Sequence, residues 1–169
     1  MESRAKVLGH SIHQILIVFP LGLLSTAVIF DLVQMATHNA TMAMVTYWVM
    51  AAGIIGGLLA APFGTIDWLA IPRGTRAASI GLAHGVTMFI VVLLFIASWA
   101  LRFQTPDTPP PVATWIAVGG GVLAVIGGWL GGELVSRLSV GVDDGANLNA
   151  PSSLRGRVFT QRPQDFRPV

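Results

Sequence analysis

The chain has 169 residues, of which 53% are hydrophobic and only 11% are charged, with a formal net charge of +2. A soluble domain carries roughly 25% charged residues. The low charged fraction and the mean hydropathy of +0.70 therefore exclude a soluble domain. The small net positive charge gives no reason to expect nucleic-acid binding. Cysteine is absent, which excludes disulfides, thiolate metal sites and c-type haem attachment.

Four apolar stretches follow one another, each near the ~20 residues that a helix needs to cross a bilayer. Each must be helical, because hydrocarbon offers no water to backbone polar groups. The first exceeds the ~7–15-residue core of a signal peptide, so we expect it to be retained. We predict an all-α integral membrane protein, a four-transmembrane-helix bundle over residues 1–138 followed by a polar tail over residues 139–169. The predicted helices cover residues 15–36, 47–71, 78–101 and 112–134.

The basic residues predict the orientation of the bundle. They precede the first helix, lie between the second and third, and follow the fourth, whereas a single arginine, Arg102, lies on the opposite side. Lys and Arg near helix ends stay cytoplasmic, so both termini and the polar tail are predicted to be cytoplasmic. The chain is expected to cross the lipid bilayer several times.

A stripe of small residues runs along the fourth helix. Gly120, Ala124, Gly128 and Gly132 recur at every fourth position. Such stripes let helices approach closely in lipid, where packing drives their association. We expect the stripe to pack tightly inside the bundle. A cleft beside a large planar cofactor is one alternative, and a homo-oligomer formed through glycine-rich helix faces is another.

Ionisable side chains in the predicted helices gather near the cytoplasmic face. Polar groups at membrane depth are costly, so each is a candidate functional residue. Asp31 is the exception, because it lies near the outer end. We expect it to pair with the loop between the first and second helices or with the loop between the third and fourth, where Arg102 is the candidate partner. The residues near the cytoplasmic face are His10, His13, Asp67, His84 and Glu133.

The histidines of the first and third helices lie at similar depth and predict a ligand pair. His84 is the only histidine clearly inside the hydrocarbon. His10 and His13 precede the first predicted helix and would share a helical face if the helix began that early, with His13 the deeper of the two. Imidazole is the commonest ligand of metals and also holds haem iron. We therefore predict one haem b bound by His13 and His84, with His10 as the alternative to His13. The competing interpretation is a buried imidazole that is hydrogen-bonded to a neighbouring helix.

The two inner carboxylates have a structural interpretation. Asp67 is expected to pair with Arg73 or Arg76 in the following loop, or to cap a helix end. Glu133 is expected to pair with Arg137, which lies one helical turn further on.

Three functional classes remain open from the residues alone. The favoured one is an electron-transfer component that works with a redox partner or quinone and is not an enzyme on its own. In the second, Asp67 and Glu133 join His13 and His84 in a divalent-metal or proton site of a channel or transporter. The third is a cofactor-free anchoring or assembly subunit.

Several segments together resemble a known family of bacterial membrane proteins. They are GHSIHQILIVFPLGLLSTAVIFDLV (residues 9–33), FGTIDWLAIPRGTRA (63–77), LAHG (82–85) and GGWLGGELVSRLSVGVDDGANLNAPSSL (127–154). The chain resembles the family called domain of unknown function 2231 from Gly9 to about Leu154. The family often has a further histidine shortly before the Phe-Pro pair, where this chain has Val18. The resemblance implies a membrane-embedded fold located in the bacterial cytoplasmic (inner) membrane, and it carries a hint of redox chemistry.

Overall fold

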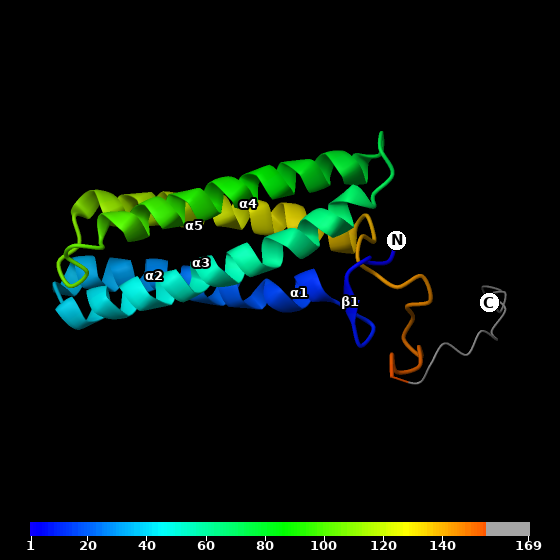
Figure 1. The fold of residues 1–169 in the computed structure, drawn as a ribbon, viewed down its shortest axis with the longest axis horizontal. Helices are drawn as coiled ribbons and strands as arrows, with labels where there is room; N and C mark the ends of the chain where they lie inside the picture. The colour runs from blue at the N-terminus through cyan, green and yellow to red at the C-terminus, as the bar shows by residue number, and fades with distance from the viewer. Residues whose placement is uncertain (155–169) are drawn as a thin grey trace, which may run out of the picture.

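The computed structural model describes residues 1–154 and consists mainly of long helices packed side by side (Figure 1). A short antiparallel hairpin precedes them, in which Lys6 lies opposite Ser11. The elements in chain order are β1 (Lys6–Val7), β2 (His10–Ser11), α1 (Ile12–Leu16), α2 (Val18–Thr37), α3 (Ala40–Leu69), α4 (Arg76–Leu101) and α5 (Pro111–Ser136).

Within residues 1–154, four helical segments are long and apolar enough to cross a membrane, which confirms the predicted number. The first, Ile12–Thr37, combines α1 and α2, and the other three are α3, α4 and α5. The interruption between α1 and α2 lies at Ile17, one turn before Pro20. Because proline has no N–H, the Leu16 carbonyl loses its helical partner, and α1 ends at that residue.

The helix α3 begins seven residues earlier than the sequence predicted. Asn39 caps it, since its side chain accepts a hydrogen bond of 2.9 Å from the Thr41 amide. His38 adopts a left-handed conformation with φ 54° and ends α2. Only these two residues join α2 to α3, so the loop predicted over residues 37–46 is wrong.

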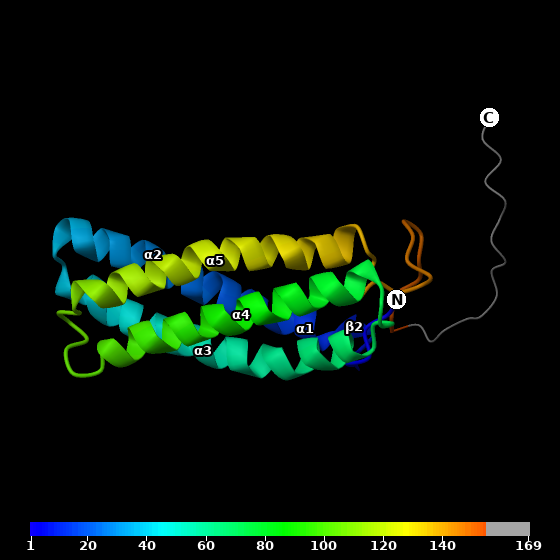
Figure 2. The ribbon, with the colours of Figure 1, turned by 90° about the horizontal axis from the view of Figure 1, so that it is seen from above.

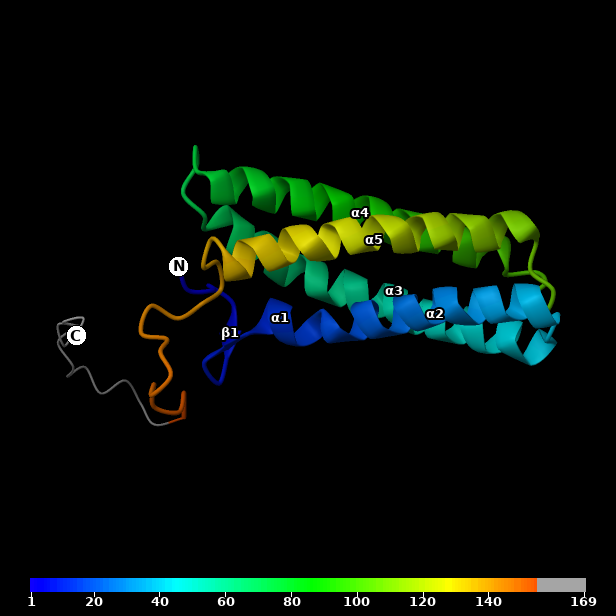
Figure 3. The same ribbon diagram turned by 180° about the vertical axis from the view of Figure 1, so that it is seen from behind.

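The bundle has two distinct ends. The N-terminus, residue 154 and the α3–α4 connection lie at one end, which we call the terminal end (Figures 1 and 3). The α2–α3 and α4–α5 connections lie at the other, which we call the loop end. The assignment of the terminal end to the cytoplasm stays a prediction, and residues 155–169 of the predicted tail lie outside the described residues.

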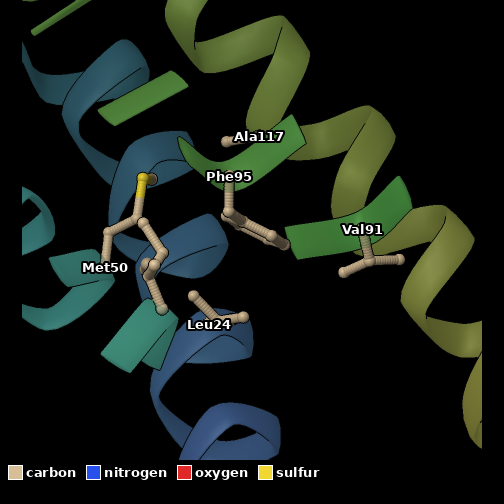
Figure 4. Close-up of a cluster of buried hydrophobic side chains, with 7 residues drawn as sticks. Leu24, Met50, Val91, Phe95 and Ala117 are labelled. Atoms are coloured by element: carbon tan, nitrogen blue, oxygen red, sulfur yellow. The ribbon is translucent and has the colours of Figure 1, made fainter. Parts of the chain in front are cut away.

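The helices pack as two helical hairpins. The contacts are most extensive between α2 and α3 and between α4 and α5, and α3–α4 and α2–α5 contacts join the two pairs (Figure 2). Each of α2, α3, α4 and α5 contributes to one apolar core (Figure 4). The core residues are Leu24, Ala27, Met50, Ile54, Val91, Phe95 and Ala117.

The glycine stripe of α5 lies inside the bundle only in part. A Cβ atom added at Gly120 would lie 3.1 Å from the Phe95 ring, so this glycine allows close packing against α4. Gly128 and Gly132 have open space at the same position. The stripe predicted as one packing face therefore packs only along its loop-end half, because Gly128 and Gly132 point away from the neighbouring helices.

Candidate functional site

His13 lies near the start of α1 and rests on α3. Its Nδ1 atom is 3.0 Å from the carbonyl oxygen of Ala60. A Cβ atom added at Gly64 would lie 2.7 Å from the imidazole Cε1, so the ring occupies the space that this glycine leaves. Because the Ala60 carbonyl can only accept, Nδ1 donates and the second ring nitrogen, Nε2, keeps its lone pair in the neutral imidazole.

His84 lies on α4 and makes the same contacts with α5. Its Nδ1 donates to the carbonyl oxygen of Gly127 over 2.8 Å. A Cβ atom at Gly131 would come within 3.2 Å of the imidazole Cε1. The Nε2 atom of this neutral imidazole is therefore also unprotonated.

The two imidazoles, one from each helical hairpin, lie close together in a T-shaped arrangement. Their ring centroids are 6.5 Å apart and their planes are nearly perpendicular, at 87°. Both side chains are half-buried. Among residues 1–154, neither Nε2 atom has a hydrogen-bond partner. The predicted proximity of His13 and His84 is confirmed. Their role as ligands stays a prediction, and each ring keeps one nitrogen with a free lone pair.

His10 lies apart from this pair. It belongs to β2, is exposed, and has its Nδ1 3.1 Å from the carbonyl oxygen of Leu8. The hairpin places it outside α1, whereas the sequence suggested a common helical face with His13. We therefore take His13 as the histidine that the first helix contributes.

The carboxylate of Asp67 anchors the N-terminal segment. It accepts hydrogen bonds from the Ser3 hydroxyl (2.7 Å) and from the backbone amides of Arg4 (2.7 Å) and Ala5 (3.3 Å). The predicted pairing with an arginine of the α3–α4 loop is wrong, because the chain preceding β1 folds back over the end of α3. Ser3 was missed, since residues before the first helix carry no periodic signal.

Glu133 pairs across helices. Its Oε1 atom lies 2.6 Å from Nη2 of Arg76, at the start of α4. The predicted pairing with Arg137 is wrong. Antiparallel packing of α4 and α5 brings the start of α4 beside the end of α5, so Arg76 reaches Glu133.

The predicted four-residue metal site is not assembled. Within residues 1–154, no group of three or more His, Asp or Glu side chains is arranged to hold a metal ion. Asp67 and Glu133 are used by the N-terminal segment and by Arg76, so the carboxylates do not join His13 and His84.

The predicted ion pair at the loop end is formed and is fully buried. Arg102 contacts both carboxylate oxygens of Asp31, at 2.6 and 2.7 Å. Ser98 accepts a hydrogen bond of 3.1 Å from the same guanidinium and donates one of 2.7 Å to the Ala113 carbonyl. Asp31, Ser98 and Arg102 have 0% exposure, so this contact ties α2, α4 and α5 together out of reach of water.

The N-terminal segment contacts the segment that follows α5 over the terminal end. The Met1 ammonium group donates to the Ser139 carbonyl over 2.8 Å, and the Gly141 amide donates to the Met1 carbonyl over 2.9 Å. The Lys6 ammonium group contacts Asp143 and Glu2. The hydrogen bond to Asp143, followed by that to Glu2, raises the pKa of Lys6 above its ordinary value of 10.5.

The fold and this site define an integral membrane protein of four helical spans with a histidine pair between its two helical hairpins. Residues 9–144 match the family of predicted membrane proteins called DUF2231, and the chain belongs to that family. The resemblance noted from the sequence is confirmed. No curated protein and no solved structure matches the chain.

Proposed function

We propose that the protein binds one haem b between α1 and α4, with His13 and His84 as axial ligands, and that it works as a membrane electron-transfer component. The separation of the two rings carries this proposal. Two metal–nitrogen bonds of ~2.0–2.1 Å, together with half the width of each imidazole, span a distance close to the 6.5 Å between the ring centroids.

The hydrogen bonds of the two rings support the same proposal. A histidine that ligates a metal almost always donates its other N–H to a carboxylate, a backbone carbonyl or water. Ala60 and Gly127 supply such carbonyls, at 3.0 and 2.8 Å from the Nδ1 atoms. These bonds fix the tautomer with a free Nε2 lone pair and increase the basicity of both ligands.

The charge at the terminal end also fits haem b, whose propionate groups are anionic. Arg4, Arg73 and Arg137 lie at this end and are exposed. When bound, the haem iron supplies one-electron redox chemistry, and the chain sets its potential through the axial ligands and their hydrogen bonds. A divalent-metal transporter has less support, because Asp67 and Glu133 are engaged elsewhere.

The absorption spectrum of the purified, haem-supplemented protein tests the proposal. We expect a Soret band in the native protein and its loss in His13→Ala and His84→Ala, with monodisperse protein in both. His84→Gln should also lose the band while keeping the bundle folded, since glutamine retains a hydrogen-bond donor toward Gly127.

The matched controls are His10→Ala and His38→Asn. Asparagine is used at position 38 because the left-handed φ of 54° there disfavours alanine. Both variants should keep the native haem content. A colourless but folded native protein after haem supplementation would overturn the proposal, and stoichiometric zinc or copper in that protein would favour a metal site formed by the two imidazoles.

A further inference from the structure

The two histidines occupy the same place in two equivalent helical hairpins. Each donates its Nδ1–H to a carbonyl on the second helix of its own hairpin. In each case the residue four positions after that carbonyl is a glycine that lies against the ring. The two carbonyl and glycine pairs are Ala60 with Gly64 and Gly127 with Gly131.

The equivalence extends along the hairpins toward the loop end. When His13 is aligned with His84, Leu24 corresponds to Phe95, and when Gly64 is aligned with Gly131, Gly53 corresponds to Gly120. The packing agrees, because a Cβ atom at Gly53 would meet Leu24 and one at Gly120 would meet Phe95. Further corresponding residues, all fully buried, are Ala27 with Ser98, Met50 with Ala117, and Thr46 with Ala113.

The topology allows both hairpins to be related by one axis. The first helix of each hairpin begins at the terminal end, and the second returns to it (Figure 2). Each first helix also contacts the second helix of the other hairpin, through the α2–α5 and α3–α4 contacts. Parallel repeats of this kind are related by a two-fold axis along the membrane normal.

The buried ion pair lies at corresponding positions of the two hairpins. Asp31 follows His13 by 18 positions, and Arg102 follows His84 by the same number. A residue that lies close to a two-fold axis contacts the corresponding residue of the other repeat. The two imidazoles do so at the terminal end, 6.5 Å apart, and the two charged groups do so at the loop end, 2.6 Å apart.

We infer that the chain consists of two equivalent helical hairpins related by a pseudo-two-fold axis, and that Asp31 and Arg102 are the positioning residues that select how the hairpins pair. Identical residues at these positions would place like charges together in a buried site. Opposite charges permit only the pairing of the first hairpin with the second. That pairing places His13 opposite His84, and this consequence for the cofactor rests on the proposed function.

Exchange of corresponding residues tests the inference. We expect Asp31→Arg alone and Arg102→Asp alone to reduce the yield of monodisperse protein in detergent by about tenfold or more, because each buries two like charges. The fourfold variant Ala27→Ser, Asp31→Arg, Ser98→Ala, Arg102→Asp should restore the native yield. In that variant the new serine can donate to the Thr46 carbonyl, as Ser98 donates to Ala113 in the native protein.

A milder exchange covers the case in which the charge-reversed chains do not fold. Ser98→Ala should lower the melting temperature, and Ala27→Ser added to it should recover most of the loss, since a hydroxyl group returns beside the ion pair from the corresponding position. If neither exchange recovers yield or melting temperature, the two positions are not equivalent and the inference is wrong.

Both readouts are independent of haem. A native protein that is folded but colourless would overturn the proposed cofactor and leave this test intact. Failure of both exchanges in a haem-containing protein would overturn only the pseudo-symmetry. If the exchanges succeed, the restored fourfold variant should also regain the native haem content, as expected when the ion pair positions the histidines.

Discussion

The polar groups inside the bundle are paired differently at its two ends. At the loop end, the Arg102 guanidinium contacts both oxygens of Asp31 and the Ser98 hydroxyl, and all three side chains are excluded from solvent. At the terminal end, His13 and His84 each use one ring nitrogen and stay half-buried. A paired charge stabilises the fold, whereas an imidazole with a free lone pair remains able to bind a ligand.

The largest expected effect comes from removing one partner of the ion pair. Arg102→Met should lower the free energy of unfolding by about 3–5 kcal/mol, because it leaves the Asp31 carboxylate buried without a partner. The measurement is the equilibrium unfolding of purified protein in mixed detergent micelles.

The control for this prediction removes both charges. Asp31→Leu combined with Arg102→Met should be much less destabilised than Arg102→Met, since apolar replacement of a whole buried pair is often neutral. Equal loss in the single and double variants would show that the loop end is not stabilised in the way the ion pair indicates.

An intermediate effect is expected from the glycines that support the two rings. Gly64→Ala should displace the His13 imidazole and Gly131→Ala the His84 imidazole, each costing about 1–3 kcal/mol through overpacking. Gly64→Ala should be the more severe, since its Cβ would lie 2.7 Å from the ring, compared with 3.2 Å at Gly131. Thermal unfolding and the Soret band measure the two consequences.

Two glycines of the α5 stripe that have open space beside them provide matched controls. Gly128→Ala and Gly132→Ala add a methyl group where a Cβ atom meets no other atom within 4 Å, so they should leave the stability and the spectrum unchanged. Similar losses in these variants would show that the effect comes from the helix and not from the histidine site.

The smallest effect is a pH dependence of the contact between the N-terminal segment and the segment that follows α5. The pKa of Lys6 is raised above 10.5 by Asp143 and Glu2, so its contribution to stability is complete below the unfolded pKa and is lost as the pH rises through the folded pKa. Hydrogen exchange at Gly141, corrected for the intrinsic rate, should therefore stay slow at neutral pH and increase only in strong alkali.

Lys6→Met should show the fast exchange already at neutral pH, while Arg73→Met, at an exposed arginine of the α3–α4 loop, should match the native protein. Slow exchange in Lys6→Met would mean that the backbone bond from Gly141 to Met1 holds the segment without the ion pairs.

Single-residue features of the sequence gave the ligand candidates but not their surroundings. His13 and His84 were recognisable because imidazoles at membrane depth are rare. Their partners, the carbonyl oxygens of Ala60 and Gly127, were not, since every residue has a backbone carbonyl. The partners of Asp67 and Glu133 were predicted from nearby positions, whereas the chain brought Ser3 and Arg76 from more than 50 positions away.

The sequence by itself determined the class of protein, the number of spans and the pairing of Asp31 with Arg102, because a bilayer requires long apolar helices and leaves a buried charge few partners. Only the tertiary structure decided which groups meet at the terminal end. Helix rotation and the antiparallel register of each hairpin place one glycine against each imidazole, and these depend on packing among distant residues that no local pattern encodes. The correspondence of the two hairpins also became visible only in the tertiary structure. Most corresponding residues differ in type but occupy equivalent positions and make equivalent contacts.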